Sequence, residues 1–214
     1  KLSHSATTLY INGKQSEDLL ITWAQKLLTE LQNKPAIGEH LSKAIDAQLE
    51  SKEQTASSTI EKVKELTHRK GSLTMFLYRC LIDAPINETE KAVVLQLGYT
   101  LQLADDIIDA YDDTADKINT TANATDLLSV ENHFQEQINI SKKLFLNSYG
   151  GSRRVKKAFL QFELLFGISH FAVKRFKKMN IEQFNTGTIL QHRRSNFIID
   201  MEKPSDFLKV LFYF

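Results

Sequence analysis

Apolar residues recur every three to four positions along most of this chain, which is the period of an amphipathic helix. The alternation of apolar and polar residues that is typical of strands is not evident. Three prolines and eight glycines in 214 residues, with long runs of Leu, Ala, Lys, Glu and Gln, likewise favour helices. The pattern therefore predicts an all-α fold, with helices over residues 16–33, 39–50, 58–82, 88–113, 127–148 and 153–178.

Local signals indicate where these helices begin and end. Ser58 to Glu61 has the Ser-x-x-Glu form of a capping box, and Asn87 to Glu90 offers a second reciprocal cap. Asn33 to Gly38 and Gly150 to Gly151 are expected to break helices. Gly71 lies inside a helical stretch, where glycine costs about 1 kcal/mol relative to alanine, so we expect an interruption, a bend or a close backbone approach there. The polar runs 51–58 and 114–126 are expected to be loops.

Composition and charge narrow the class of protein. A chain of 214 residues that is 42% hydrophobic suits one domain, which we expect to span residues 1–214. Lys and Arg number 27 against 26 Asp and Glu, so there is no electrostatic case for a nucleic-acid partner. The single cysteine, Cys80, excludes an intramolecular disulfide and fits a reducing compartment. Without a long apolar run or a secretory leader, the sequence predicts a soluble, cytoplasmic protein.

The segment LQLADDIIDAYDD, residues 101–113, places five carboxylates within an otherwise apolar helix. Like charges at this spacing repel, so they need a compensating cation or protons. Carboxylates suit hard cations, and Mg²⁺ typically takes one or two of them plus waters and substrate phosphates. A solvated acidic surface, a calcium site and a glycosidase dyad are weaker alternatives. The residues expected on one helical face are Gln102, Asp105, Asp109, Asp112 and Asp113.

Residues 97–109, LGYTLQLADDIID, resemble the second aspartate-rich motif of trans-prenyl diphosphate synthases, which are all-α class I isoprenoid enzymes. The resemblance implies a bundle of antiparallel helices around a central cavity, in which Mg²⁺ helps to ionise a prenyl (allylic) diphosphate. It implies that Asp105 and Asp109 bind the metal directly, while Asp106, Asp112 and Asp113 assist and Gln102 orients the group. It also implies a homodimer.

A basic segment about 35 residues upstream strengthens the resemblance. The sequence HRKGSL, residues 68–73, looks like the family's K-T-G-x-L segment, which directs a lysine at the substrate diphosphate. Alignment on Gly71 puts Arg69 at the family's Lys position and Lys70 at its Thr position, so we expect either cation to bind diphosphate. Gln48 is a fainter match to the family's G-Q-x-x-D stretch. The residues expected on an apolar wall for the prenyl tail are Met75, Phe76, Leu77 and Tyr99.

Two departures from the family pattern leave the activity open. No first aspartate-rich motif occurs between Lys1 and Asp46. We expect one of two explanations: the motif lies upstream of Lys1, on N-terminal helices that this chain lacks, or the protein has lost that motif. The loop 116–121 lacks the family's usual arrangement of lysines. This departure puts elongation of a prenyl chain in doubt and leaves cyclisation and head-to-head condensation as alternatives. The alternative is a non-catalytic helical subunit that retains the fold and pairs with an active synthase.

Other polar clusters have simpler interpretations. His133, His170 and His192 lack neighbours at metal-ligand spacing and are interpreted as surface or hydrogen-bonded core residues. The basic runs at 153–157, 174–178 and 193–194 are most simply solvated helical faces. Together with the aromatic tail at 207–214, they also raise the alternative of a weak membrane-surface contact.

Overall fold

The computed structural model describes residues 35–55, 57–82, 84–182 and 188–199. The helix expected over 16–33 and the aromatic tail at 207–214 lie outside the described residues. Within those ranges the fold is helical and contains no strand, which confirms the all-α prediction. The elements in chain order are α3 (Pro35–Glu50), η1 (Ser51–Glu53), α4 (Ile60–Cys80), α5 (Glu88–Ile108), α6 (Ala110–Ala115), α7 (Leu127–Tyr149), α8 (Arg153–Lys178), η2 (Ile189–Gln191) and η3 (Arg194–Asn196).

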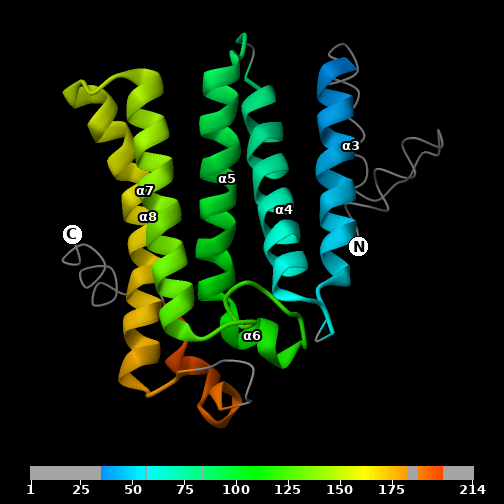
Figure 1. The fold of residues 1–214 in the computed structure, drawn as a ribbon, viewed down its shortest axis with the longest axis vertical. Helices are drawn as coiled ribbons and strands as arrows, with labels where there is room; N and C mark the ends of the chain where they lie inside the picture. The colour runs from blue at the N-terminus through cyan, green and yellow to red at the C-terminus, as the bar shows by residue number, and fades with distance from the viewer. Residues whose placement is uncertain (1–34, 56, 83, 183–187, 200–214) are drawn as a thin grey trace, which may run out of the picture.

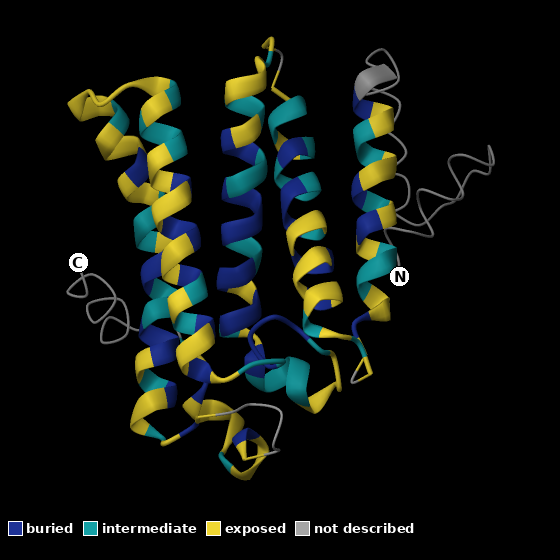
Figure 2. Ribbon diagram, viewed as in Figure 1, coloured by how far each residue is buried: buried dark blue, intermediate teal, exposed yellow. Residues whose placement is uncertain are grey.

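The long helices stand side by side, and successive ones run in opposite directions (Figure 1). Helix α5 is central: it packs on α4 on one side and on α7 and α8 on the other, while α3 covers the far side of α4. This position explains why the sequence of α5 is apolar on most faces, as its many buried residues indicate (Figure 2). Short α6, η2 and η3 lie at the end where α5 stops and α7 begins, which we call the pocket end.

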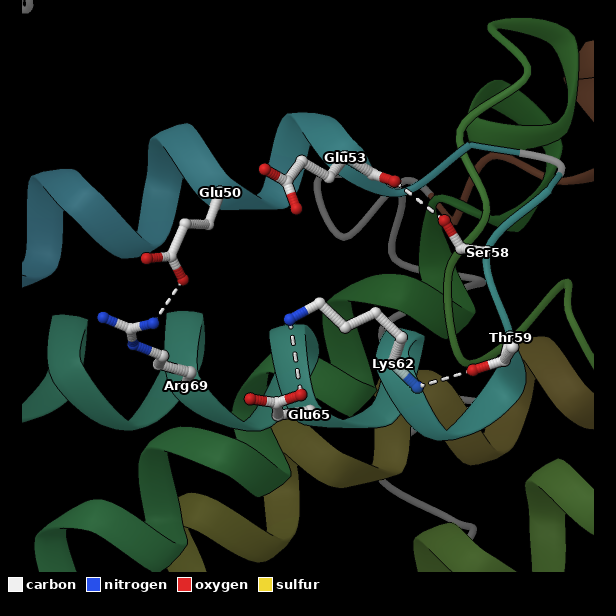
Figure 3. A network of polar contacts seen from close by, with 7 residues as sticks. All are labelled: Glu50, Glu53, Ser58, Thr59, Lys62, Glu65 and Arg69. Carbon is white, nitrogen blue, oxygen red and sulfur yellow. Dashed lines mark hydrogen bonds and ion pairs between the residues drawn. The ribbon is translucent and has the colours of Figure 1, made fainter.

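Helix α3 is described from Pro35 onward and runs through Gly38, so the break expected over 33–38 does not include residues 35–38. The starts of α4 and α5 show how local chemistry sets helix boundaries. The cap of α4 is Thr59 and not Ser58: its hydroxyl accepts from Lys62 N at 3.3 Å (Figure 3). The Asn87 cap is confirmed, since its Oδ1 accepts from Glu90 N at 2.8 Å. Helices α7 and α8 fall within one residue of their expected ends.

Gly71 marks a close approach of two helices. Helix α4 runs through this residue without the interruption considered above. A Cβ added to Gly71 would lie 2.4 Å from the carbonyl oxygen of Gly98 on α5, and a Cβ on Gly98 would lie 2.4 Å from the carbonyl oxygen of Gly71. The two backbones therefore touch, and farther along the same interface the Thr67 hydroxyl of α4 donates to Asp106 of α5 at 3.2 Å.

The acidic helix is shorter than expected. Helix α5 ends at Ile108, Asp109 forms a bend, and α6 resumes at Ala110. The amides of Asp109 and Asp113 still donate to the carbonyls four residues earlier, each at 2.9 Å, so a helical spacing persists across the bend. The expected loop begins at Asp116 and is pinned to the segment after α3, because Asn119 N donates to Gln54 O at 2.9 Å.

Candidate functional site

A cavity of about 340 Å³ opens at the pocket end between α4, α5, α6, η1 and the loop after α6. One wall carries Asp105, Asp106, Asp109 and Asp113. The remaining polar lining comes from several elements, and its members are Ser51, Lys52, Gln54, Lys70, Gln102 and Thr120. Side chains separated by more than 60 residues in sequence thus converge on one acidic pocket.

Asp106 is the buried anchor of this acidic pocket, with 6% of its surface exposed. Its Oδ2 accepts from the Thr67 hydroxyl of α4 at 3.2 Å, and its Oδ1 accepts from the Gln102 amide at 3.0 Å. The same amide donates to Asp105 Oδ2 at 3.2 Å. Thr121 extends the chain of contacts by donating to Thr67 at 3.1 Å. Gln102 therefore lies at the pocket as expected, and its amide holds two carboxylates in place.

The pKa values of the pocket carboxyls are raised, mainly by burial and secondarily by repulsion between the carboxylates. Burial is the main cause that raises the pKa of Asp106 to about 6, against the hydrogen bonds from Gln102 and Thr67. Burial, followed by repulsion from Asp106 and Asp109, raises the pKa of Asp113 to about 7. Burial and Asp105 also raise the pKa of Asp109. Carboxyls in this state favour either protons or a bound cation.

The donor chemistry of the pocket fits Mg²⁺ without a preformed cage. Among the described residues, no three His, Cys, Asp or Glu side chains are placed to hold a metal ion by themselves. Mg²⁺ does not require such a group, since it commonly takes one or two carboxylates and completes its shell with waters and phosphate oxygens. Asp105 and Asp109 are exposed on the pocket wall and are the carboxylates that such an ion could reach.

A buried hydroxyl on the opposite wall is a second, independent indication of a ligand. Thr120 is 4% exposed and lines the pocket. Its Oγ1 has no hydrogen-bond partner among the described residues, whereas buried hydroxyls are normally paired. The oxygen itself has almost no accessible surface, so a ligand in the pocket would contact it only after rotation of the Thr120 side chain.

Of the two candidate cations, the structure places only Lys70 in the pocket. Arg69 is not a lining residue and forms an ion pair with Glu50 of α3 (Figure 3). Neighbouring residues on a helix diverge by about 100°, so these two side chains could not share one target. Lys70 is therefore the candidate cation that lies at the pocket, and which of the two cations binds a diphosphate stays a prediction.

Two further expected residues lie outside the pocket. Gln48 is exposed on α3, and its amide is 3.5 Å from the Thr74 hydroxyl. Asp112 forms a bidentate ion pair with Arg194 of η3, at 2.7 Å for both contacts. On a helix Asp106 and Asp112 point about 120° apart, so the side chain of Asp112 points away from a pocket that includes Asp106.

The residues expected on an apolar wall do not line this pocket. Phe76 is buried edge-on against His40, at 4.8 Å between ring centroids. Tyr99 is buried, and its hydroxyl is 2.7 Å from His133 Nε2.

Sequence reasoning missed the wall formed by Lys52, Gln54 and Thr120. These residues lie in or beside irregular segments, where no periodicity indicates the direction of a side chain. The one available signal was the run of small polar residues that follows the acidic motif, Asn119 to Thr121.

Among the described helices, none is long and apolar enough to cross a membrane. Comparison of the chain with protein-family models, curated proteins and solved structures gave no match.

Proposed function

We propose that the acidic pocket binds the diphosphate of a prenyl substrate together with Mg²⁺, and that the protein is a prenyltransferase or a related class I isoprenoid enzyme. The observation that supports this most is the convergence of four carboxylates with Lys70 on one pocket, whose lining also includes a buried hydroxyl without a hydrogen-bond partner among the described residues. The reaction is ionisation of an allylic diphosphate: the C–O bond to the allylic carbon breaks, and its electron pair leaves with pyrophosphate.

The residues of the pocket have distinct roles in this proposal. Asp105 and Asp109 would hold the metal, since they are the exposed members of the acidic wall. Asp106 and Asp113 lie deeper and would assist them through bound water. When bound, Mg²⁺ supplies positive charge that stabilises the departing pyrophosphate.

Cationic and neutral donors complete the diphosphate side of the pocket. Lys70 would bind diphosphate oxygens as a point charge, and Lys52 provides a second cation on the wall formed by η1. The Thr120 hydroxyl would donate to an oxygen of the ligand and so gain the partner that it lacks. Gln102 keeps Asp105 and Asp106 fixed, so that less of the binding energy is lost in ordering them.

The test of this proposal is turnover. The full chain is incubated with Mg²⁺, isopentenyl diphosphate and allylic diphosphates of increasing length, and release of pyrophosphate and prenyl products are measured. Lys70→Gln should lower the rate about 100-fold, the effect typical for removal of one electrostatic group. Arg69→Gln is the matched control, because its side chain lies outside the pocket; equal losses in the two variants would contradict the site assignment.

A non-catalytic subunit that retains the fold and pairs with an active synthase is the second candidate, favoured by the finding that among the described residues no three His, Cys, Asp or Glu side chains are placed to hold a metal ion. Such a subunit would bind Mg²⁺ and pyrophosphate but release no pyrophosphate from any allylic substrate. Binding without turnover would therefore select this alternative. A homodimer and a cytoplasmic location, which the resemblance and the composition suggest, remain predictions.

A further inference from the structure

Helix α8 begins with charges that oppose its dipole. After the cap at Ser152, four of its first five residues are the cations Arg153, Arg154, Lys156 and Lys157, and its first turn contains no acidic residue. All four are exposed, and none forms an ion pair with another residue in the described ranges. Cations at a helix N-terminus are unfavourable, because that end of the helix already carries positive charge. Folding of the helix therefore gives no reason for this cluster.

Large apolar side chains are exposed around the same end of the bundle. Tyr78 and Ile82 are each 60% exposed where α4 ends, and Tyr149 is 43% exposed where α7 ends. Leu160 of α8 is 42% exposed, three residues after Lys157. Figure 1 shows that the α4–α5 and α7–α8 connections lie at this end, opposite α6, and Figure 2 shows exposed residues there. The acidic pocket is lined by residues at the α6 end. We call this surface, with its four cations and four apolar side chains, the distal end.

We propose that the distal end docks onto an anionic lipid membrane. Cations that attract lipid headgroups, combined with tyrosine and aliphatic side chains that enter the interface, are the features of a peripheral membrane-binding surface. Glu88, exposed at the start of α5, also lies at this end but pairs with Lys91 at 3.5 Å, so the four cations of α8 leave the surface with excess positive charge, although the net charge of the whole chain is only +1. For membrane binding, the clustering of cations at one end of the molecule therefore matters more than the net charge of the chain.

The acidic pocket gives this docking a direction. Its carboxylates lie at the opposite end of the bundle from the basic cluster. An anionic surface would attract the distal end and repel the pocket end, which orients the bundle with its pocket away from the bilayer. Exposed apolar side chains at the same end as the cations favour lipid over nucleic acid, which would need a basic stripe that tracks a phosphate backbone.

The test is cosedimentation of the full chain with phosphatidylcholine vesicles that contain or lack phosphatidylserine. We expect binding only to the anionic vesicles, weakened by salt. Each cation near an anionic surface contributes roughly a fivefold change in partitioning, so Arg153→Gln with Arg154→Gln should weaken binding about 25-fold. The matched control is Lys64→Gln with Lys178→Gln, which removes the same charge from exposed positions away from the distal end and should change little.

Other outcomes separate lipid from competing explanations. Ile82→Ser with Leu160→Ser should weaken binding at every salt concentration, because it removes apolar contacts and leaves the charge unchanged. Equal binding to neutral vesicles, equal losses in the control pair, or binding to a DNA duplex but not to vesicles would each overturn the proposal. Asp109→Asn should leave vesicle binding intact, so failure of this proposal and failure of the proposed function can be told apart.

Discussion

The contact between Gly71 and Gly98 gives a prediction with a magnitude that the structure sets. In a Gly71→Ala variant the new Cβ would lie 2.4 Å from the Gly98 carbonyl oxygen and 2.6 Å from Gln102 Cβ. Ordinary contact requires 3.4 Å or more, so α4 and α5 have to separate by about 1 Å. Overpacking of this kind costs about 1–3 kcal/mol, while replacement of a helical glycine by alanine returns up to about 1 kcal/mol. We therefore expect a net loss of about 1–2 kcal/mol in the free energy of unfolding.

The same displacement should weaken the acidic pocket. The Thr67 hydroxyl donates to Asp106 across this interface at 3.2 Å, and a further 1 Å would break the bond. Affinity for Mg²⁺ and pyrophosphate should fall together with stability, as measured by urea denaturation and by calorimetry on the same preparation.

Gly38→Ala is the matched control for this substitution. Gly38 lies in α3 with no atom within 4 Å of an added Cβ, so alanine there should raise the free energy of unfolding by about 0.5–1 kcal/mol and leave binding unchanged. If Gly71→Ala is stabilised to the same degree as Gly38→Ala, the helices are not in backbone contact and the reasoning is refuted.

Three further predictions concern the pocket and one helix cap. Because Asp106 and Asp113 have folded-state pKa values of about 6 and about 7, against an ordinary 3.8, the folded chain binds protons more tightly than the unfolded chain. Without Mg²⁺, the free energy of unfolding should therefore fall as pH rises from about 4 to about 7, and Asp106 alone should account for a fall on the order of 2–3 kcal/mol. Added Mg²⁺ should reduce this dependence on pH. If urea denaturation shows a free energy of unfolding that rises over the same range, the assignment is contradicted. Thr120→Val should stabilise the ligand-free protein by about 1 kcal/mol, because it removes a buried hydroxyl without a partner among the described residues. The same substitution should weaken pyrophosphate binding. Unchanged binding in calorimetry would show that the hydroxyl does not contact the ligand. Asn87→Ala should lower the free energy of unfolding by about 1 kcal/mol, measured by thermal unfolding, because α5 loses its cap. Pyrophosphate affinity should not change, because the cap lies at the end of α5 that is far from the pocket.

The helices were largely predictable because their signals are local. Apolar periodicity and the breaker at Gly150 to Gly151 located α7 and α8, and the side chain of Asn87 fixed the start of α5. The end of α5 was not predictable in the same way. The bend at Asp109 interrupts a run of residues with good helical spacing, and tertiary packing of α6 against η2 accompanies it.

The acidic half of the candidate site was predictable and its cationic half was not. Asp105, Asp109 and Asp113 lie on the helical face that the spacing predicts. Asp112, expected on the same face, pairs with Arg194, and Asp106, not placed on that face, lies buried at the pocket. The choice between Arg69 and Lys70 depends on Glu50, a residue of another helix that binds Arg69 and draws it out of the pocket. Lys52 and Thr120 reach the pocket through irregular segments, whose paths depend on contacts distant in sequence.

The most direct test of the account is calorimetric titration of the full chain with inorganic pyrophosphate in the presence and absence of Mg²⁺. The account predicts one binding site that requires Mg²⁺, that weakens at least tenfold in Asp109→Asn, and that persists in Asp112→Asn, whose side chain pairs with Arg194 outside the pocket. Absence of binding in the unaltered chain, or equal weakening in the two variants, would contradict it.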